Sequence, residues 1–346
     1  MIQKNEISYA KLFSIERLFS AWNIFKDGKS KRKDVLIFEN KLEENIFDLY
    51  NDLTNLTYQH SEYTSFHIYD PKLRHIHKAC IRDRLVHQIL YSYLCGIYER
   101  KFIFHSYSSR LGKGTHRAVA NLSKAAGKVS KNYYKNCFAL KCDVKRFYDT
   151  VCHEILLKLI LKELRDKKII AIIKDIISSY NTKNIPNKGM PIGNLTSQVF
   201  SNIYLNELDQ FIKHELKVPY YFRYADDFIL LSQDCEFLQN ITIKIEQFIS
   251  RQLAISLHPK KVIIRRLSQG IDFLGYIVLP YYKNIRTKTK RRMWKKLYQA
   301  QCLLHDSKLS KESLTQVLNS YAAMLSHADA YDLNNNIRNI FGSDCS

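Results

Sequence analysis

Two adjacent aspartates, Asp226 and Asp227, constrain the fold of this chain more than any other feature. Aromatic and aliphatic residues occupy positions 220–222 before the pair and positions 228–231 after it, and such runs favour a β-strand on each side. Two carboxylates at the tip of a buried hairpin are costly unless cations neutralise them, and Mg²⁺ is the natural ion for clustered oxygen ligands. The alternative is an ordinary acidic turn between two solvated strands.

A third aspartate, Asp143, closes another candidate strand. Across residues 138–144, apolar residues alternate with Ala139, Lys141 and Asp143, which predicts a strand whose apolar face points away from these three. If Asp143 faces Asp226 across a sheet, the carboxylates would suit a two-metal site. In such a site, ions about 4 Å apart hold the attacking and leaving oxygens of a phosphoryl transfer.

The charge of the chain indicates a polyanionic partner. Lys and Arg number 54 against 33 Asp and Glu, a formal net charge of +21, so nucleic acid is the leading candidate and an anionic membrane surface the competing one. Without a long apolar span, signal peptide or Cys-x-x-Cys pair, we expect a cytoplasmic protein with no membrane partner and with reduced thiols. Zinc is not expected at His75, His77 and Cys80, because no second pair of ligands follows.

Apolar residues recur at helical spacing in several segments. They predict one helix across residues 38–56 and another that begins at Ile81. A long amphipathic helix is expected to start at Asn194, with Asn194 or Thr196 as its N-cap. The basic run 283–296 is expected to belong to a helical segment.

Five motifs, taken in order, resemble those of reverse transcriptases. They are Asp143 with a tyrosine five residues later, Gly-Met-Pro-Ile-Gly at 189–193, Tyr-Ala-Asp-Asp at 224–227, His-Pro-Lys-Lys at 258–261 and Phe-Leu-Gly-Tyr at 273–276. Any one of them would be a weak signal, whereas their order and spacing make a chance match very improbable. The resemblance implies an α+β fold of the right-hand polymerase type.

Three consecutive domains are implied by this resemblance. Residues 1–136 would form the fingers, and residues 137–280 the palm, with a small antiparallel sheet, interleaved finger helices and the primer grip. Residues 281–346 would form a short helical thumb. Its basic residues, including Arg291 and Arg292, would contact an RNA–DNA duplex, although the same pattern fits the solvent face of a helical cap.

The resemblance also implies the chemistry of the site. Two Mg²⁺ ions, for which Mn²⁺ could substitute, would be bound by Asp143, Val144, Asp226 and Asp227. The primer 3′-hydroxyl would attack the α-phosphate of a dNTP, and the palm lysine, here Lys261, would protonate the leaving pyrophosphate. The protein would contribute positioning and charge neutralisation.

Residues 66–78 are expected to form a hairpin of the fingers that turns at Asp70-Pro71. In the family, basic residues of this hairpin bind the triphosphate of the incoming dNTP, and Lys72 and Arg74 match by position. Arg74 would supply a rigid fork of donors for phosphate, whereas Lys72 could instead be a solvated lysine.

Other positions are implied near the nucleotide and the nucleic acid. Tyr148 matches the ring that leaves no room for a 2′-hydroxyl and so selects dNTP over rNTP, or it is a core tyrosine. Arg110 and Lys113 lie in a Ser-Tyr-x-x-Arg-x-Gly-x-Gly motif and would offer charge to a template phosphate or to the nucleotide. Gly275 would let the primer-grip hairpin approach the strand closely, and Gln198 would lie near the nascent base pair.

The segment 191–198 separates subfamilies. Retroviral and group II intron enzymes carry Pro-Gln-Gly where this chain has Pro-Ile-Gly, with Ile192 in place of the glutamine. Together with the following Asn-Leu-Thr-Ser-Gln, and with residues 25–85 and 320–331, this resembles the bacterial or phage-encoded reverse transcriptases of diversity-generating retroelements. Ile192 could also be simple core packing.

That subfamily implies partners and a product. The partners would be a template RNA, dNTPs, the RNA–DNA duplex and an oligomer of a small basic accessory protein. The product would be cDNA with errors opposite template adenine, which diversifies a target gene. The alternatives are a phage-defence enzyme that makes untemplated DNA, another prokaryotic reverse transcriptase such as a retron or group II intron enzyme, and a non-catalytic RNA-binding module with this fold.

Overall fold

The computed structural model divides into two compact units, and it describes residues 7–70, 72–182 and 185–341. Unit 1 is built from residues 1–104, 143–217 and 244–259, and unit 2 from residues 105–142, 218–243 and 260–346. Each unit therefore draws on separated stretches of the chain. The division into fingers, palm and thumb stays a prediction.

Unit 1 opens with four helices, of which α2 packs against the later helix α5. The helices are α1 (Tyr9–Leu12), α2 (Ile15–Lys26), α3 (Lys33–Glu39), α4 (Leu42–Thr54) and α5 (Ile81–Tyr98). Leu18, Trp22 and Phe25 recur at helical spacing along α2 and are buried, so α2 presents an apolar stripe to the interior of the unit. The start of α5 at Ile81 confirms that prediction.

The helix predicted across residues 38–56 is shorter than expected. It coincides with α4, which does not reach back to residue 38 or forward to Leu56. Past the end of α4, Thr57 donates its N–H to the carbonyl oxygen of Asp52, and the chain reverses direction. Leu56 therefore leaves the apolar stripe, with a φ of 60° and an exposed fraction of 50 %.

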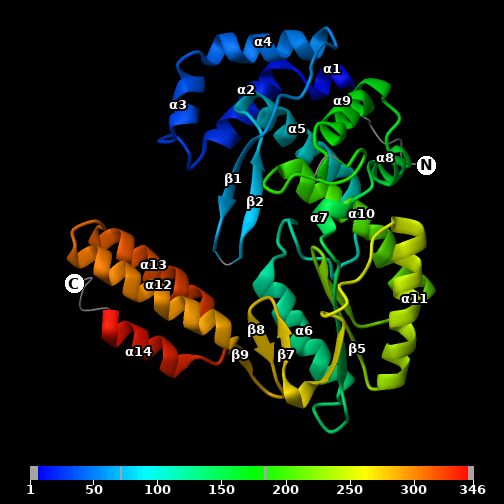
Figure 1. Ribbon diagram of the computed structural model, residues 1–346, viewed down its shortest axis with the longest axis vertical. Coiled ribbons are helices and arrows are strands. Elements are labelled where there is room, and N and C mark those ends of the chain that lie inside the picture. Colours follow the sequence, from blue (N-terminus) through cyan, green and yellow to red (C-terminus); the bar gives the residue numbers. More distant parts are fainter. Residues whose placement is uncertain (1–6, 71, 183–184, 342–346) are drawn as a thin grey trace. The chain divides into compact units, whose positions relative to one another are not determined.

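A two-stranded hairpin lies between α4 and α5, as predicted. Its strands, β1 (Thr64–Ile68) and β2 (Arg74–Lys78), pair antiparallel, and Figure 1 shows them as a ribbon that extends from the helices of unit 1. The expected turn at Asp70-Pro71 falls between these strands, and Pro71 lies outside the described residues.

The remainder of unit 1 is mainly helical, and the long helix α10 lies against α5 and α8. The elements are α7 (Phe147–Thr150), α8 (His153–Leu161), α9 (Lys167–Ser178), α10 (Leu195–Gln210) and a π-helical continuation at Phe211–Glu215. The last part of α11 (Cys235–Leu253) also belongs to this unit.

The prediction that α10 is amphipathic is wrong, because this helix is enclosed by its neighbours. Small polar side chains are buried together with the apolar ones: Thr196, Ser197, Ser201 and Asn202. Asn194 does occupy the N-cap position, but its side chain does not cap the helix. It donates instead to the carbonyl oxygen of His77 at the end of β2.

Unit 2 contains two small sheets with antiparallel pairing. The larger has the order β4–β5–β3–β6 and consists of β3 (Phe138–Asp143), β4 (Tyr221–Tyr224), β5 (Asp227–Ser232) and β6 (Ile263–Arg266). The smaller consists of β7 (Ile271–Phe273), β8 (Tyr276–Val278) and β9 (Lys283–Ile285). The strands predicted beside the aspartate pair and before Asp143 are thus confirmed.

Helix α6 (Thr115–Val129) joins the two sheets of unit 2, because it contacts β4, β5 and β8. Leu122 and Ala126 of α6 share one apolar core with Phe222 of β4 and Phe273 of β7. Ala139 also belongs to this core, although the alternation along β3 assigned it to the polar face. The sheet is therefore covered on both faces at that position.

The basic run 283–296 is helical only from Thr287, because its first residues form β9 and pair with β8. Three helices follow, α12 (Thr287–His305), α13 (Lys311–Leu325) and α14 (Tyr331–Phe341), and they lie side by side (Figure 1). Leu297 of α12 and Phe341 of α14 are buried in the core that contains β7 and β8. No helix in the described part of the chain combines the length and apolar composition needed to cross a membrane.

Candidate active site

The aspartate pair lies in a two-residue turn. Tyr224 of β4 stands opposite Asp227 of β5, so Ala225 and Asp226 alone connect the strands. Ala225 has a φ of 52°, in the left-handed region that residues with a side chain seldom adopt. Such backbone conformations cost about 1–3 kcal/mol and concentrate at functional sites, where the surrounding structure holds them. The turn thus displays Asp226 at the tip of a constrained hairpin.

A buried arginine supports this turn with a hydrogen bond to its backbone. Arg223 is fully buried, and its Nη1 donates to the carbonyl oxygen of Ala225 over 3.2 Å. Its backbone N–H donates to His105 and its carbonyl oxygen accepts from Tyr107, so residues 105–107 run alongside β4. No motif predicted a role for Arg223, although a charged residue inside an apolar strand was the available signal.

Lys141 connects the turn to the second sheet of unit 2. Its Nζ lies 3.4 Å from Oδ2 of Asp227 and donates to the carbonyl oxygen of Asp272 in β7 over 2.8 Å. Both charged side chains are about three-quarters buried, with exposed fractions of 25 % and 24 %. The alternation along β3 put Lys141 on the same face as Asp143, which is the signal that could have identified it.

Lys261, the predicted palm lysine, lines a pocket of about 340 Å³ together with Lys141. Three further charged side chains, Arg265, Asp272 and Arg286, line the pocket beside apolar ones, and cations outnumber the single carboxylate. Arg286 Nε lies 2.9 Å from Asp272 Oδ2. The structure therefore brings Lys261 and Lys141 to one positively charged cavity that suits an anionic group.

Asp143 is the last residue of β3, and its backbone is fixed to the His-Pro-Lys-Lys segment. The carbonyl oxygen of Asp143 accepts from the N–H of His258 over 2.7 Å, and Val144 forms a β-bridge with Leu257. A few residues later, α7 carries the half-buried Tyr148, whose carbonyl oxygen accepts from the N–H of Met190 in the Gly-Met-Pro-Ile-Gly motif. Three motifs that are distant in sequence therefore meet through main-chain contacts.

The donors present fit Mg²⁺, because carboxylates are hard oxygen ligands and this ion needs only one or two of them beside water and substrate phosphates. Asp226 and Asp227 are both partly exposed, so solvent can reach them. Within residues 7–70, 72–182 and 185–341, no group of three or more histidine, cysteine, aspartate or glutamate side chains is gathered as a metal site. The four-residue ligand set with Val144 stays a prediction.

The hairpin β1–β2 is joined at its base to the segment that contains Ile192. The carbonyl oxygen of Ile192 accepts from the N–H of His77 over 3.1 Å. Gly193 has a φ of 116°, and a Cβ atom there would lie 2.9 Å from Cγ2 of Ile76, so the close approach requires glycine. Gln198 lies half-buried in the first turns of α10.

The basic residues of the hairpin are exposed. Lys72 lies in the connection, and Arg74 is the first residue of β2. Because side chains alternate along a strand, Arg74 shares a face with Ile76, the residue that meets Gly193. His75 lies on the other face. Its ring stacks on the ring of the histidine opposite it in β1, with the ring centroids 4.5 Å apart.

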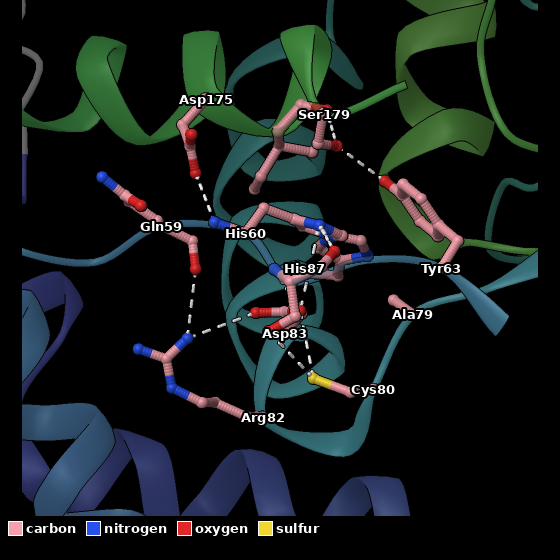
Figure 2. Close-up of polar contacts among 12 residues, drawn as sticks. Gln59, His60, Tyr63, Ala79, Cys80, Arg82, Asp83, His87, Asp175 and Ser179 are labelled. Carbon is pink, nitrogen blue, oxygen red and sulfur yellow. Dashed lines mark hydrogen bonds and ion pairs between the residues drawn. The ribbon is translucent and has the colours of Figure 1, made fainter. Parts of the chain in front are cut away.

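The root of the hairpin is anchored by a buried carboxylate that none of the predicted motifs contains. Figure 2 shows Asp83, in the first turn of α5, among Arg82, Cys80 and the backbone around His60. Oδ1 of Asp83 accepts from the hydroxyl of Tyr58 over 2.9 Å. Oδ2 accepts from the N–H of residue 61 and from Sγ of Cys80, each over 3.0 Å.

Charges around Asp83 keep it ionised. Burial raises its pKa, but His60 and the hydrogen bonds from Cys80, Tyr58 and the main chain outweigh burial, so the net pKa is lowered. The neighbouring His87 is 1 % exposed, and burial lowers its pKa to about 3, so it stays neutral. Asp83 therefore supplies the negative charge of this cluster.

The residues predicted to contact nucleic acid lie in unit 2. Arg110 donates to the carbonyl oxygen of Ser106 over 2.8 Å, and Lys113 Nζ lies 5.7 Å above the ring of Tyr107. Gly275 has a φ of 90° in the two-residue turn between β7 and β8. Arg291 and Arg292 are exposed on α12.

Comparison with known proteins identifies the family. Residues 70–278 match the family described as reverse transcriptase (RNA-dependent DNA polymerase). The chain belongs to this family. The matched residues include both candidate aspartate motifs, the strand β2 of the hairpin and the predicted primer grip. The match therefore includes the elements that carry the candidate site.

Curated relatives of this reverse transcriptase are distant. Protein YkfC of Escherichia coli K12 is 23% identical over 242 residues, covering 59% of this chain and 63% of that protein. The group II intron-encoded protein LtrA of Lactococcus lactis subsp. cremoris is 23% identical over 274 residues, covering 59% of this chain and 44% of LtrA. The chain thus spans less than two thirds of the length of these relatives.

Solved structures show the fold. The telomerase of Candida albicans in complex with a fragment of telomeric RNA matches with a TM-score of 0.50 at 12% identity, over 86% of this chain and 61% of that one. Apo telomerase from Candida tropicalis gives the same TM-score and identity over 68% of this chain and 58% of that one. This likeness confirms the predicted α+β, right-hand polymerase fold of the reverse transcriptase.

Proposed function

We propose that this chain is an RNA-directed DNA polymerase and that Asp143, Asp226 and Asp227 are its metal-binding carboxylates. The observation that carries the proposal is the constrained two-residue turn with Asp226 at its tip and Asp227 beside Lys141. The strand β3, which neighbours β5 in the sheet, ends at Asp143. Paired carboxylates held on a tight turn suit a hard divalent cation.

Mg²⁺, when bound, would neutralise charge on the triphosphate and activate the primer 3′-hydroxyl, and Mn²⁺ is expected to substitute for it. The residues of the chain would do the rest. Lys261 would give a proton to the leaving pyrophosphate, and its cationic pocket favours the anionic product. Arg74 would bind the triphosphate, and Tyr148 would restrict the sugar to deoxyribose.

Primer extension on an RNA template tests this function. With Mg²⁺ present, we expect incorporation of dNTPs in the order that the template dictates, and none after chelation with EDTA. A DNA primer annealed to RNA of defined sequence gives the clearest result, because product sequencing separates templated from untemplated synthesis. Incorporation that ignores the template or survives chelation would contradict the proposal.

We further propose that the enzyme serves a diversity-generating retroelement, with a structured template RNA and a small basic accessory protein as partners. The net charge of +21 supports RNA binding. The subtype rests on Ile192, which replaces the glutamine of faithful relatives. Its main chain is held by His77, so a change of side chain leaves the local backbone in place.

Changing Ile192 to glutamine is expected to lower misincorporation opposite template adenine by roughly ten-fold while retaining synthesis. An isoleucine side chain offers no hydrogen bond and discriminates only shape, worth ~1–3 kcal/mol, whereas an amide can penalise a misplaced pair more strongly. The measurement is sequencing of cDNA made from a defined template RNA by wild type and variant.

The matched control for this change is Ile185→Gln, because Ile185 is 48 % exposed and undergoes the same chemical substitution. Its error spectrum should equal that of the wild type. Equal adenine error rates in wild type and Ile192→Gln would refute the role of this residue. Faithful copying by the wild type with its RNA and accessory protein present would refute the subtype.

A further inference from the structure

Three segments of unit 2 that the proposed function assigns to nucleic-acid binding meet at one cluster of side chains. His116 stands at the start of α6, directly after the loop that carries Lys113. Tyr276 follows Gly275 in β8, and His327 follows the end of α13. The cluster therefore joins the glycine loop, the primer-grip hairpin and the C-terminal helices.

The geometry of this cluster is specific. The rings of His116 and His327 stack with centroids 3.8 Å apart and 18° between their planes. The hydroxyl of Tyr276 lies 3.0 Å from Nδ1 of His116 and donates to the carbonyl oxygen of Met324 over 3.0 Å. We refer to His116, Tyr276, Met324 and His327 as the clasp.

The hydrogen bonds of Tyr276 determine which tautomer His116 adopts. A carbonyl oxygen only accepts, so the single hydroxyl proton of Tyr276 is committed to Met324. Nδ1 of His116 must therefore donate to the hydroxyl oxygen. The tautomer and the ring orientation of His116 are set by β8, and this orientation in turn provides the flat surface on which His327 stacks.

A second link holds the same connection between α13 and α14. The N–H of Lys283 in β9 donates to Oδ2 of Asp329 over 2.8 Å, and the N–H of Asp329 donates to the carbonyl oxygen of Lys283 over 2.8 Å. Leu325 and Ala330, on either side, are buried in the core that contains Tyr276. The C-terminal helices are thus attached to β8 and β9 at one corner.

The imidazole stack lies at the surface, where it can be protonated. His116 and His327 are both exposed, and two stacked imidazolium ions would repel. His327 and Tyr276 face His116. Burial raises the pKa of Tyr276 to about 12. Arg117, the next residue of α6, turns its guanidinium to the carbonyl oxygen of Gly112. Burial and His327 lower the pKa of His116, so His116 is neutral near neutral pH.

We propose that His116 and His327 are positioning residues for the template–primer duplex. Through the clasp they hold the C-terminal helices against the primer-grip hairpin, so that the exposed arginines of α12 and the turn at Gly275 contact one duplex together. The inference rests on the proposed function. It adds two residues that none of the predicted motifs assigned to a site.

The test compares His327→Ala, which removes the stack, with His327→Phe, which keeps a ring that cannot be protonated. The control is His305→Ala, an exposed histidine at the end of α12. We would measure the Kd for an RNA–DNA duplex by fluorescence anisotropy at about pH 7.5 and about pH 5, above and well below the ordinary histidine pKa, because the pKa of His116 is lowered. KM for the duplex and kcat would be measured by primer extension.

We expect His327→Ala to raise Kd and KM about five-fold with kcat within about two-fold of wild type, as the loss of one ring stack predicts. His327→Phe should bind like wild type at the higher pH and lack the weaker binding that wild type shows at the lower pH. A Kd for His327→Ala no higher than that of the control, or wild-type pH dependence in His327→Phe, would overturn the inference. Because binding needs no catalysis, an inactive wild type would refute the proposed function alone.

Discussion

Replacing Asp226 by asparagine is expected to lower dNTP incorporation by roughly 10³-fold or more. The substitution keeps the shape of the side chain but removes its charge, and an amide is a poor ligand for Mg²⁺. Asp226 stands at the tip of the two-residue turn, where the strained Ala225 and the buried Arg223 hold the backbone. The turn should therefore persist in the variant. Single-turnover extension of a primer on an RNA template is the measurement.

Glu236→Gln is the matched control for Asp226→Asn, because Glu236 is exposed on α11, lies in the same unit and loses the same charge. Both variants should bind an RNA–DNA duplex within about two-fold of wild type, since neither residue belongs to the predicted basic face. Turnover by Asp226→Asn at the rate of the control would show that Asp226 is not a metal ligand.

The hairpin that carries the aspartates was predictable because its signals are local. Aromatic and aliphatic runs flank a short polar turn, and a two-residue connection of this kind fixes the register of both strands. The same holds for β3, where one residue in two is apolar. These elements need no information from distant parts of the chain.

The character of α10 was not predictable from its periodicity. Asn202 and Asp209 are polar and lie seven residues apart on one side of the helix, which a helical wheel assigns to solvent. They are small enough to pack inside unit 1, and only the arrangement of α5 and α8 around the helix decides that they do. The strand β9 was not predicted for another reason. It has three residues, which are too few to show a periodic pattern.

Contacts between side chains of distant segments could not be predicted from the sequence. The pairing of Lys141 with Asp227, and of His116 with His327, depends on how sheets and helices pack. The motifs predicted the candidate catalytic residues. The residues that support their backbone, such as Arg223 and Asp83, belong to no motif or periodic pattern and were not predicted. Those supporting residues are where mutations should affect the protein most strongly outside the site.

Replacing Asp83 by asparagine is expected to destabilise the protein by about 3–5 kcal/mol, which corresponds to a fall in Tm of roughly 6–20 °C. Asp83 is fully buried and is the common acceptor for Tyr58, Cys80 and the N–H of residue 61 (Figure 2). An amide nitrogen in place of one oxygen would face donors rather than acceptors, and Arg82 would lose a buried partner 3.5 Å away. Thermal unfolding followed by circular dichroism measures the effect.

The exposed Asp48 of α4 provides the control, because Asp48→Asn removes the same charge from the same unit and should change the free energy of unfolding by about 0.5 kcal/mol at most. The pH dependence gives a second check. The pKa of Asp83 is lower in the folded protein than in the unfolded chain, so its ionised form stabilises the native state above about pH 4. That contribution is lost as the pH falls through the folded pKa, and the wild type should then approach Asp83→Asn in stability. A Tm difference between the two that is small at neutral pH, or that persists unchanged in acid, would show that the charge of Asp83 does not hold the root of the hairpin.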